Sequence, residues 1–206
     1  MIPLMIDFTG RKVVIFGGGA VGLRKARYFA GEADVSVYSR SFHPDFTDLP
    51  VRKEHIILSA NSDLIAQLIH GSSLVIAATS DTDLNECIKK VSRSEGLLCN
   101  VAAGSPGNVF LPAKISGEKF TIAISTIGSV PAVSRLIREE LEESFPDLDR
   151  LVELGEWIRD EYRKNTGGSS SYESVLYQAL RDPDTRNALS KGQMQAQQFV
   201  REKYVS

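Results

Sequence analysis

The stretch Lys12-Val-Val-Ile-Phe-Gly-Gly-Gly-Ala-Val-Gly22 decides the fold of this chain. Its opening run, Lys12 to Phe16, is apolar after the lysine, which is typical of a strand buried on both faces. Glycines follow at once, and residues 20–30 then carry apolar side chains at helical spacing. A strand, a glycine turn and a helix in direct succession predict the first half of a β-α-β unit.

The glycines of this turn, Gly17, Gly19 and Gly22, fit the spacing G-x-G-x-x-G. In this setting the first glycine permits the tight turn, the second lets a pyrophosphate approach the backbone, and the third lets helix and strand pack closely. The N–H groups of Ala20 and Val21 would lie at the helix N-terminus, where an anion is favoured. We therefore predict a dinucleotide site, and the alternative is a glycine turn used only for packing. A Walker-type phosphate loop is excluded because no Gly-Lys-Ser or Gly-Lys-Thr follows.

Short apolar runs and helical segments continue to alternate through the first half of the chain. This alternation is typical of right-handed crossovers and a parallel sheet, so it predicts an α/β, doubly wound (Rossmann) domain over residues 1–112. The expected strands cover 12–16, 34–38, 55–58, 73–78 and 97–101, and the expected helices cover 20–30, 64–69 (capped by Asn61 or Ser62) and 83–95 (stopped by Gly96).

After Pro112 the pattern changes. Residues 119–125 alternate apolar and polar positions, which predicts a strand, and Pro131 stands at a favourable first position of a helix that runs to about Ser144. From Leu148 onward the composition favours helices, with a break at 166–171 and helices over 172–180 and 189–204. The sequence thus predicts a dinucleotide-binding domain (1–112), a dimerisation segment of strand plus helix (113–147) and a small helical C-terminal domain (148–206).

The helix that starts at Pro131 carries one apolar stripe, and more helices follow than a small sheet needs for cover. We therefore expect a homodimer that pairs through this segment. The alternative is that the helix only covers its own sheet. The stripe consists of Val133, Leu136, Ile137 and Leu141.

Composition narrows the class of protein. A net charge of -2 argues against a general nucleic-acid binder. No apolar run approaches the ~20 residues of a membrane span, and the N-terminus lacks the features of a signal peptide, so we expect a cytoplasmic protein without membrane contact. Cys87 and Cys99 suit a reducing compartment. His43, His55 and His70 lack ligand spacing, so we expect no metal site.

The ends of the later strands indicate further cofactor contacts, because ligands bind at the carboxyl ends of such strands. Ser39-Arg40-Ser41 closes the second strand, where an acidic residue would indicate NAD. Arg40 favours the extra phosphate of NADP, or it merely stacks beside the adenine, and the two readings stay open on the residues alone. Thr79 should lie near the cofactor, and Asp81 or Asp83 is expected to cap the following helix.

Several stretches together resemble one family in the same order. The start Gly17-Gly-Gly-Ala-Val-Gly-Leu-Arg-Lys-Ala26 is similar to that of the precorrin-2 dehydrogenases, which include the N-terminal module of siroheme synthase. The other matching stretches are Phe42-His-Pro-Asp-Phe46, Ala77-Ala-Thr79 with Asn85, Cys99-Asn-Val101, Val109-Phe-Leu-Pro112, Ile124 to Pro131 and Ser134-Arg-Leu-Ile-Arg138.

The resemblance implies NAD-dependent oxidation of precorrin-2 to sirohydrochlorin in siroheme or heme biosynthesis, by a homodimer. It favours NAD over NADP, because the family uses NAD without an acidic residue closing the second strand. Some members also insert iron into the product, and that activity stays open here. The members with a further methyltransferase module are much longer, so we expect this chain to lack that activity. The implied cofactor-binding residues are Gly17, Gly19, Ala20, Val21, Gly22, Arg40, Ser41, Thr79 and Val101.

The chain departs from the family pattern at one position. Members place an aspartate shortly after the Asn-Val pair, whereas Ala103 stands there in this sequence. The base is therefore unknown, with Asp81 as the weak candidate, and chelation is put in doubt with it.

A wide tetrapyrrole with eight carboxylates needs hydroxyl, N–H and basic groups. The sequence offers them around the start of the helix at Pro131, and we weigh this against capping and solvated roles. The alternatives for the whole chain are a tetrapyrrole carrier without catalysis, an NAD-sensing regulatory domain, and a dehydrogenase of another small substrate. The expected substrate-binding residues are Asn100, Ser125, Thr126, Gly128, Arg135 and Arg138.

Overall fold

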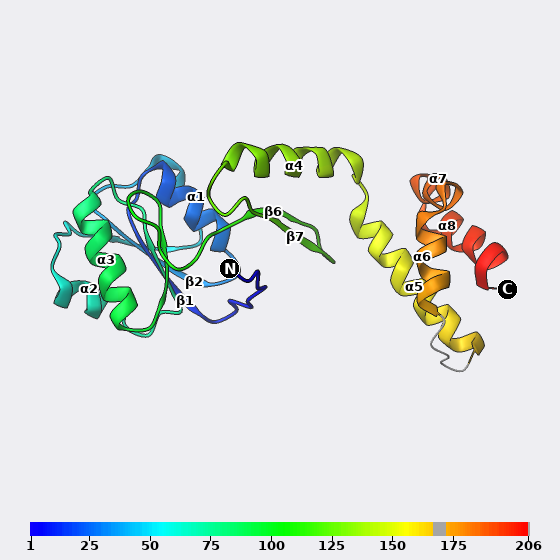
Figure 1. The fold of residues 1–206 in the computed structure, drawn as a ribbon, viewed down its shortest axis with the longest axis horizontal. Helices are drawn as coiled ribbons and strands as arrows, with labels where there is room; N and C mark the ends of the chain where they lie inside the picture. Colours follow the sequence, from blue (N-terminus) through cyan, green and yellow to red (C-terminus); the bar gives the residue numbers. More distant parts are fainter. Residues whose placement is uncertain (167–171, 206) are drawn as a thin grey trace. The chain divides into compact units, whose positions relative to one another are not determined.

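The computed structural model describes residues 1–166 and 172–205, and its contacts divide the chain into two compact units (Figure 1). The first unit is Met1–Leu111 and the second is Pro112–Ser206. Each is described by itself below.

A five-stranded parallel sheet forms the first unit. The strand order is β3-β2-β1-β4-β5, so β1 is central and the chain winds outward in both directions from it. This is the doubly wound α/β fold that the sequence predicts. The strands are β1 (Lys12–Phe16), β2 (Asp34–Ser39), β3 (Arg52–His55), β4 (Leu74–Ala77) and β5 (Leu98–Val101).

Helices cover both faces of this sheet (Figure 1). α1 (Ala20–Phe29) packs on the face that carries Val13 and Ile15, and α2 (Ser62–Ile69) and α3 (Thr82–Ser94) pack on the opposite face. All side chains of β1 after Lys12 are fully buried, because each face of the central strand lies under a helix layer. This burial explains why an unbroken apolar run marks the strand.

The third strand differs from its expected position at 55–58. β3 ends at His55 instead of beginning there, and all of its side chains are exposed. It is an edge strand that pairs only with β2. Because none of its side chains is buried, none needs to be apolar, and the sequence carries no hydrophobic pattern that would indicate it. The apolar residues that suggested a strand follow it: Leu58 packs against the core, and Ile57 is 85% exposed.

The second unit begins with an antiparallel hairpin of β6 (Ala113–Ser116) and β7 (Thr121–Ile124), on which α4 (Pro131–Ser144) packs. β7 and α4 match the expected strand and helix. β6 was not predicted, because it is short and buries only Ile115. The backbone N–H of Lys119 in the hairpin turn donates to Asp149 Oδ1 at 2.8 Å, which ties the hairpin to the next helix.

The remaining helices share a separate apolar core around Leu154 and Ile158. The single helix expected over 189–204 is interrupted at Gly192, whose φ of +149° is a conformation that other residues rarely adopt. Of the break expected at 166–171, Thr166 ends a helix and the other residues lie outside the described part. The helices are α5 (Leu148–Thr166), α6 (Tyr172–Arg181), α7 (Pro183–Lys191), α8 (Gln193–Val200) and the π-helical turn η2 (Arg201–Val205). Within residues 1–166 and 172–205, every helix is too short or too polar to cross a membrane.

Candidate dinucleotide-binding site

Two of the three motif glycines are required by close backbone approach. A Cβ on Gly17 would lie 2.3 Å from the Ala78 carbonyl oxygen, and Gly17 itself has a φ of +114°. A Cβ on Gly22 would lie 1.8 Å from the Gly17 carbonyl oxygen. Both distances are far inside van der Waals contact, so β1, β4 and α1 can approach one another only because these positions lack a side chain.

The remaining motif glycine, Gly19, faces open space. A Cβ there would meet no atom within 4 Å, and its φ of −76° with ψ of −171° is extended backbone that any residue adopts. Packing therefore does not explain this glycine. Open space directly before a helix is what a ligand would need in order to reach the backbone.

The N-terminus of α1 beside Gly19 is exposed and uncapped. Gly19 is the capping residue, no side chain accepts a hydrogen bond from the first turn, and no acidic residue lies in that turn. Ala20 and Val21 are both exposed, and within the described residues their N–H groups have no protein acceptor. These donors and the positive end of the helix dipole fit a pyrophosphate. The residues present therefore fit a dinucleotide cofactor.

The loop after β2 is pressed against the glycine turn. The His43 N–H donates to the Gly18 carbonyl at 2.7 Å, and a Cβ on Gly18 would lie 2.3 Å from the Ser41 carbonyl oxygen. The Ser39 hydroxyl donates to that same Ser41 carbonyl at 2.8 Å. Arg40 and Ser41 are both exposed directly after the end of β2.

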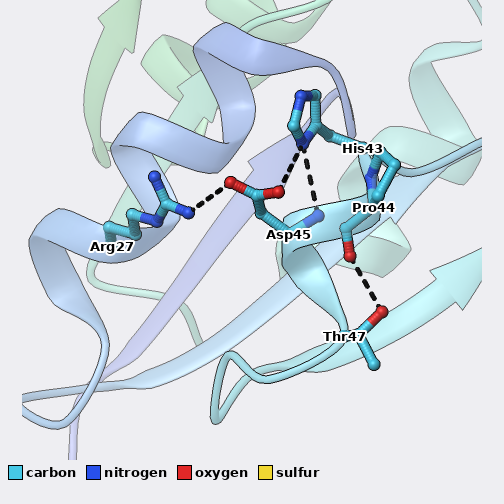
Figure 2. A network of polar contacts seen from close by, with 5 residues as sticks. All are labelled: Arg27, His43, Pro44, Asp45 and Thr47. Atoms are coloured by element: carbon cyan, nitrogen blue, oxygen red, sulfur yellow. Dashed lines mark hydrogen bonds and ion pairs between the residues drawn. The ribbon is translucent and has the colours of Figure 1, made fainter.

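A polar network holds this loop against α1 (Figure 2). Arg27 on α1 pairs with Asp45 Oδ2 at 2.7 Å, and the Asp45 N–H donates to His43 Nδ1 at 3.3 Å in the short helix η1 (Pro44–Phe46). The Thr47 hydroxyl closes that turn by donating to the Pro44 carbonyl at 2.8 Å. From the sequence we considered His43 only as a metal ligand, so this positioning role was not predicted. The spacing His-Pro-Asp before a short apolar turn is the signal that could have indicated it.

Thr79 is fixed at the carboxyl end of β4 by a buried amide. Its hydroxyl donates to Asn85 Oδ1 at 2.8 Å, and Asn85 Nδ2 donates back to the Thr79 carbonyl at 3.1 Å. Asn85 is fully buried, so this bond orders the β4–α3 turn in a low-dielectric setting. Asp81 Oδ1 accepts the N–H groups of Asp83 and Leu84, both at 3.0 Å, which confirms Asp81 as the cap of α3.

The segment after β5 closes the edge of the sheet. Asn108 Oδ1 accepts the Cys99 N–H at 2.6 Å, and Asn108 Nδ2 donates to the Leu97 carbonyl at 3.2 Å, so one side chain replaces a neighbouring strand. Asn100 is 6% exposed and donates to the Val109 carbonyl at 2.8 Å. Its Oδ1 is buried and has no partner among the described residues.

Residues 102–106 form a loop between the end of β5 and Asn108, and this loop is exposed at the carboxyl edge of the sheet. It begins where the Ala102 N–H donates to the Ala77 carbonyl at 2.9 Å, so it continues directly from the ends of β4 and β5. Half-buried Val101 ends β5, and exposed Ala103 lies within the loop. The Ser105 hydroxyl hydrogen-bonds Glu86 on α3.

The expected substrate residues of the second unit lie in and after the turn before α4. The Ser125 hydroxyl accepts the Ile127 N–H at 3.1 Å, and the Thr126 hydroxyl donates to the Val130 carbonyl at 3.0 Å. Ile127 and Gly128 have φ values of +56° and +79°, so the turn is tight. The alternative that Ser125 and Thr126 cap α4 is wrong, because the capping residue is Val130 and no side chain caps the helix.

The two arginines of α4 are engaged along the helix. Arg135 Nε pairs with Glu139 at 2.8 Å, and Arg138 pairs with Glu142 at 3.3 Å. Exposed pairs of this spacing are weak, because water screens both charges. Among the described residues, no group of three or more histidine, cysteine or acidic side chains is arranged to hold a metal ion.

The structure thus brings the motif glycines, Ser41, Thr79 and Val101 to the carboxyl edge of one parallel sheet, with an uncapped helix N-terminus beside them. This combination defines a dinucleotide-binding α/β protein. Residues 4–113 accordingly match the family model described as "Putative NAD(P)-binding".

Comparison with known proteins narrows this class. Precorrin-2 dehydrogenase of Methanosarcina barkeri is 34% identical over 92% of this chain and 87% of that protein. Siroheme synthase 2 of Aeromonas hydrophila is 34% identical over 79% of this chain, which spans about a third of that protein's length. A solved structure of SirC, precorrin-2 dehydrogenase, has a TM-score of 0.74 at 23% identity, covers 98% of this chain and 100% of that chain, and has the same fold. The chain belongs to the precorrin-2 dehydrogenase family.

Proposed function

We propose that this chain is an oxidoreductase that converts precorrin-2 to sirohydrochlorin with NAD. The observation that carries the proposal is its membership of the family over 92% of its length, together with an intact glycine turn. NAD, when bound, supplies the acceptor for a hydride. The alternatives of a carrier, a regulatory domain and a dehydrogenase of another substrate have no observation of their own in their favour.

The proposed cofactor site follows the carboxyl edge of the sheet. Ala20 and Val21 donate their N–H groups to the pyrophosphate over Gly19. Arg40 and the Ser41 backbone face the adenosine ribose, where no carboxylate is present. Thr79 and Val101, at the ends of β4 and β5, border the place of the nicotinamide ring. The chain's own contribution is to hold the ring and exclude water from it.

The proposed substrate groups of the second unit are hydroxyls and cations in and after the turn before α4. Arg135 is 76% exposed at its side chain and Arg138 is 33% exposed, so each can turn from its glutamate to a substrate carboxylate. Ala132 offers a further donor, because α4 lacks a side-chain cap. Burial of Asn100 favours an indirect role for it, in which it holds the segment at Val109 beside the site.

The proposed assembly is a homodimer that pairs through residues 113–147. On α4, Ser134 is buried and donates to the Thr126 hydroxyl, whereas Val133, Leu136 and Ile137 are 42%, 56% and 41% exposed. Apolar residues that remain exposed on a helix already packed on its own sheet support a second partner. We further propose a cytoplasmic location, which suits the two free cysteines.

The proposed activity is tested by incubating the purified chain with NAD and precorrin-2 without oxygen and following absorbance. The expected result is that the absorbance of NADH and that of sirohydrochlorin grow together. When a simple hydroxy acid replaces precorrin-2, no NADH should form. Oxidation of a hydroxy acid but not of precorrin-2 would contradict the proposal. The Gly19→Leu variant, which fills the proposed pyrophosphate place, serves as the inactive control.

A further inference from the structure

Three polar side chains form a connected cluster beside the loop 102–106. The Lys89 ammonium and the Glu86 carboxylate, both on α3, pair at 2.8 Å. Ser105 of the loop joins them, because its hydroxyl donates to Glu86 Oε1 and accepts from Lys89 Nζ. A Cβ on Gly104 would lie 3.7 Å from Glu86 Oε1, so the carboxylate lies directly behind the loop.

The cluster lies at the edge of the sheet where ligands bind. The loop continues from the carboxyl ends of β4 and β5, which is where such sheets bind the reactive part of a dinucleotide and its substrate. Glu86 directly follows Asn85, the residue that fixes Thr79 at the end of β4. Ser105 is exposed, and the Glu86 side chain is 33% exposed, so a proton that reaches the Glu86 carboxylate can pass on to water.

We propose that Glu86, reached through the Ser105 hydroxyl, accepts the proton that is released when the substrate is oxidised. The inference rests on the proposed function. Removal of two hydrogens sends one to the cofactor as a hydride with its electron pair and releases the other as a proton. That proton passes to Ser105 Oγ, the Ser105 proton passes to Glu86, and the carboxylate then loses it to solvent. Charge and atoms balance without a further reactant.

The hydrogen bonds of the cluster suit this transfer. Lys89 occupies one lone pair of Ser105 Oγ and Glu86 takes its proton, so the other lone pair is left for an incoming proton. Hydrogen bonds from Lys89 and Ser105 hold the pKa of the Glu86 carboxyl below its ordinary value, so it is ionised at neutral pH. A substrate that has lost a hydride is a cation and a strong acid, for which a weakly basic carboxylate suffices.

Asp81 is a poorer candidate for the same task. Its Oδ1 accepts two backbone N–H groups as the cap of α3, so protonation of this carboxyl would weaken the helix start. Among the described residues, Glu86 is the carboxylate that hydrogen-bonds the loop carrying Ala103. Glu86, behind the loop, thus takes the place of a carboxylate on the loop at position 103.

The test compares Glu86→Gln with Glu95→Gln, which makes the same change at the exposed far end of α3. We expect Glu86→Gln to lower kcat by about 100-fold, within the usual range for a proton-transfer group. Glu95→Gln should leave kcat unchanged. Affinity for NAD and the Tm of the cofactor-free protein should match the wild type within error for both. Adding Ala103→Asp to Glu86→Gln should recover at least a tenth of the wild-type kcat.

A second measurement needs no turnover. In the cofactor-free protein, NMR titration of labelled glutamate side chains should give Glu86 a pKa below the ordinary value of a glutamate, and Lys89→Met should raise the Glu86 pKa. If Glu86→Gln unfolds the chain, Ser105→Ala decides, because it leaves the Glu86–Lys89 pair intact and should still slow kcat more than tenfold. Wild-type kcat in the folded Glu86→Gln or Ser105→Ala variant overturns the inference alone. A wild type that binds NAD but never oxidises precorrin-2 overturns the proposed function and the inference with it.

Discussion

Replacement of the motif glycines separates their roles, because the structure assigns packing to Gly22 and ligand space to Gly19. In Gly22→Ala the new methyl carbon would lie 1.8 Å from the Gly17 carbonyl oxygen, and the opposing atoms are backbone that cannot rotate away. Overpacking usually costs about 1–3 kcal/mol, and a backbone clash belongs at the upper end. We therefore expect a loss of about 3 kcal/mol in the free energy of unfolding, which lowers Tm by roughly 10 °C in a unit of this size.

Gly19→Leu should behave in the opposite way. Extended backbone at Gly19 accepts a side chain, so the free energy of unfolding should change by less than about 1 kcal/mol. The leucine would occupy the space over Ala20 and Val21 and block two hydrogen bonds to a charged pyrophosphate. Such bonds contribute about 1.5–3 kcal/mol each, so NAD affinity should fall by about 100-fold to 10,000-fold.

Thermal unfolding and titration calorimetry with NAD measure the two effects on the same samples. Gly19→Leu should lose affinity for NAD and keep its Tm, whereas Gly22→Ala should lower the Tm. Unchanged NAD affinity in Gly19→Leu would show that the pyrophosphate does not lie over this residue. A fully stable Gly22→Ala would show that β1 and α1 do not depend on the close approach.

Three further predictions concern other parts of the chain. Hydrogen bonds from Lys203 and Tyr204 lower the pKa of Asp182 to about 2, so its contribution to stability should be complete above pH about 4 and lost as the pH falls towards 2. The free energies of unfolding of wild type and Asp182→Asn should therefore converge as the pH falls over that range. A difference between them that stays constant with pH would refute this role. If the proposed dimer forms, Leu136→Glu should yield a monomer by light scattering at micromolar concentration, and a monomeric wild type would contradict the proposed dimer. Asn108→Ala should lower the free energy of unfolding by about 1–3 kcal/mol, because the Cys99 N–H loses its partner, and equal stability in urea would disprove that role.

Much of the first unit can be predicted from the sequence because its signals are local. An apolar run marks β1 since both faces of that strand are covered, and the glycine spacing marks the turn since two of those positions cannot hold a side chain. The cap Asp81 and the glycine Gly96, with a φ of +70°, likewise follow from short-range chemistry.

The parts that escaped prediction depend on contacts between distant residues. β3 has exposed side chains and is a strand only because β2 offers an edge. Asn108 completes the opposite edge through hydrogen bonds to Leu97 and Cys99, which no local pattern indicates. The link from Ser105 to Glu86 joins a loop to the preceding helix across the fold. A residue that acts through a neighbour brought close by folding leaves no mark at its own position in the sequence.

A single turnover without oxygen measures whether this chain transfers a hydride from precorrin-2 to NAD. Enzyme, NAD and precorrin-2 are mixed in equal amounts, and NADH and sirohydrochlorin are quantified together. We expect equimolar NADH and sirohydrochlorin, and neither product in Gly19→Leu. Binding of NAD without formation of NADH, or tetrapyrrole oxidation that proceeds equally well when NAD is left out, would contradict it.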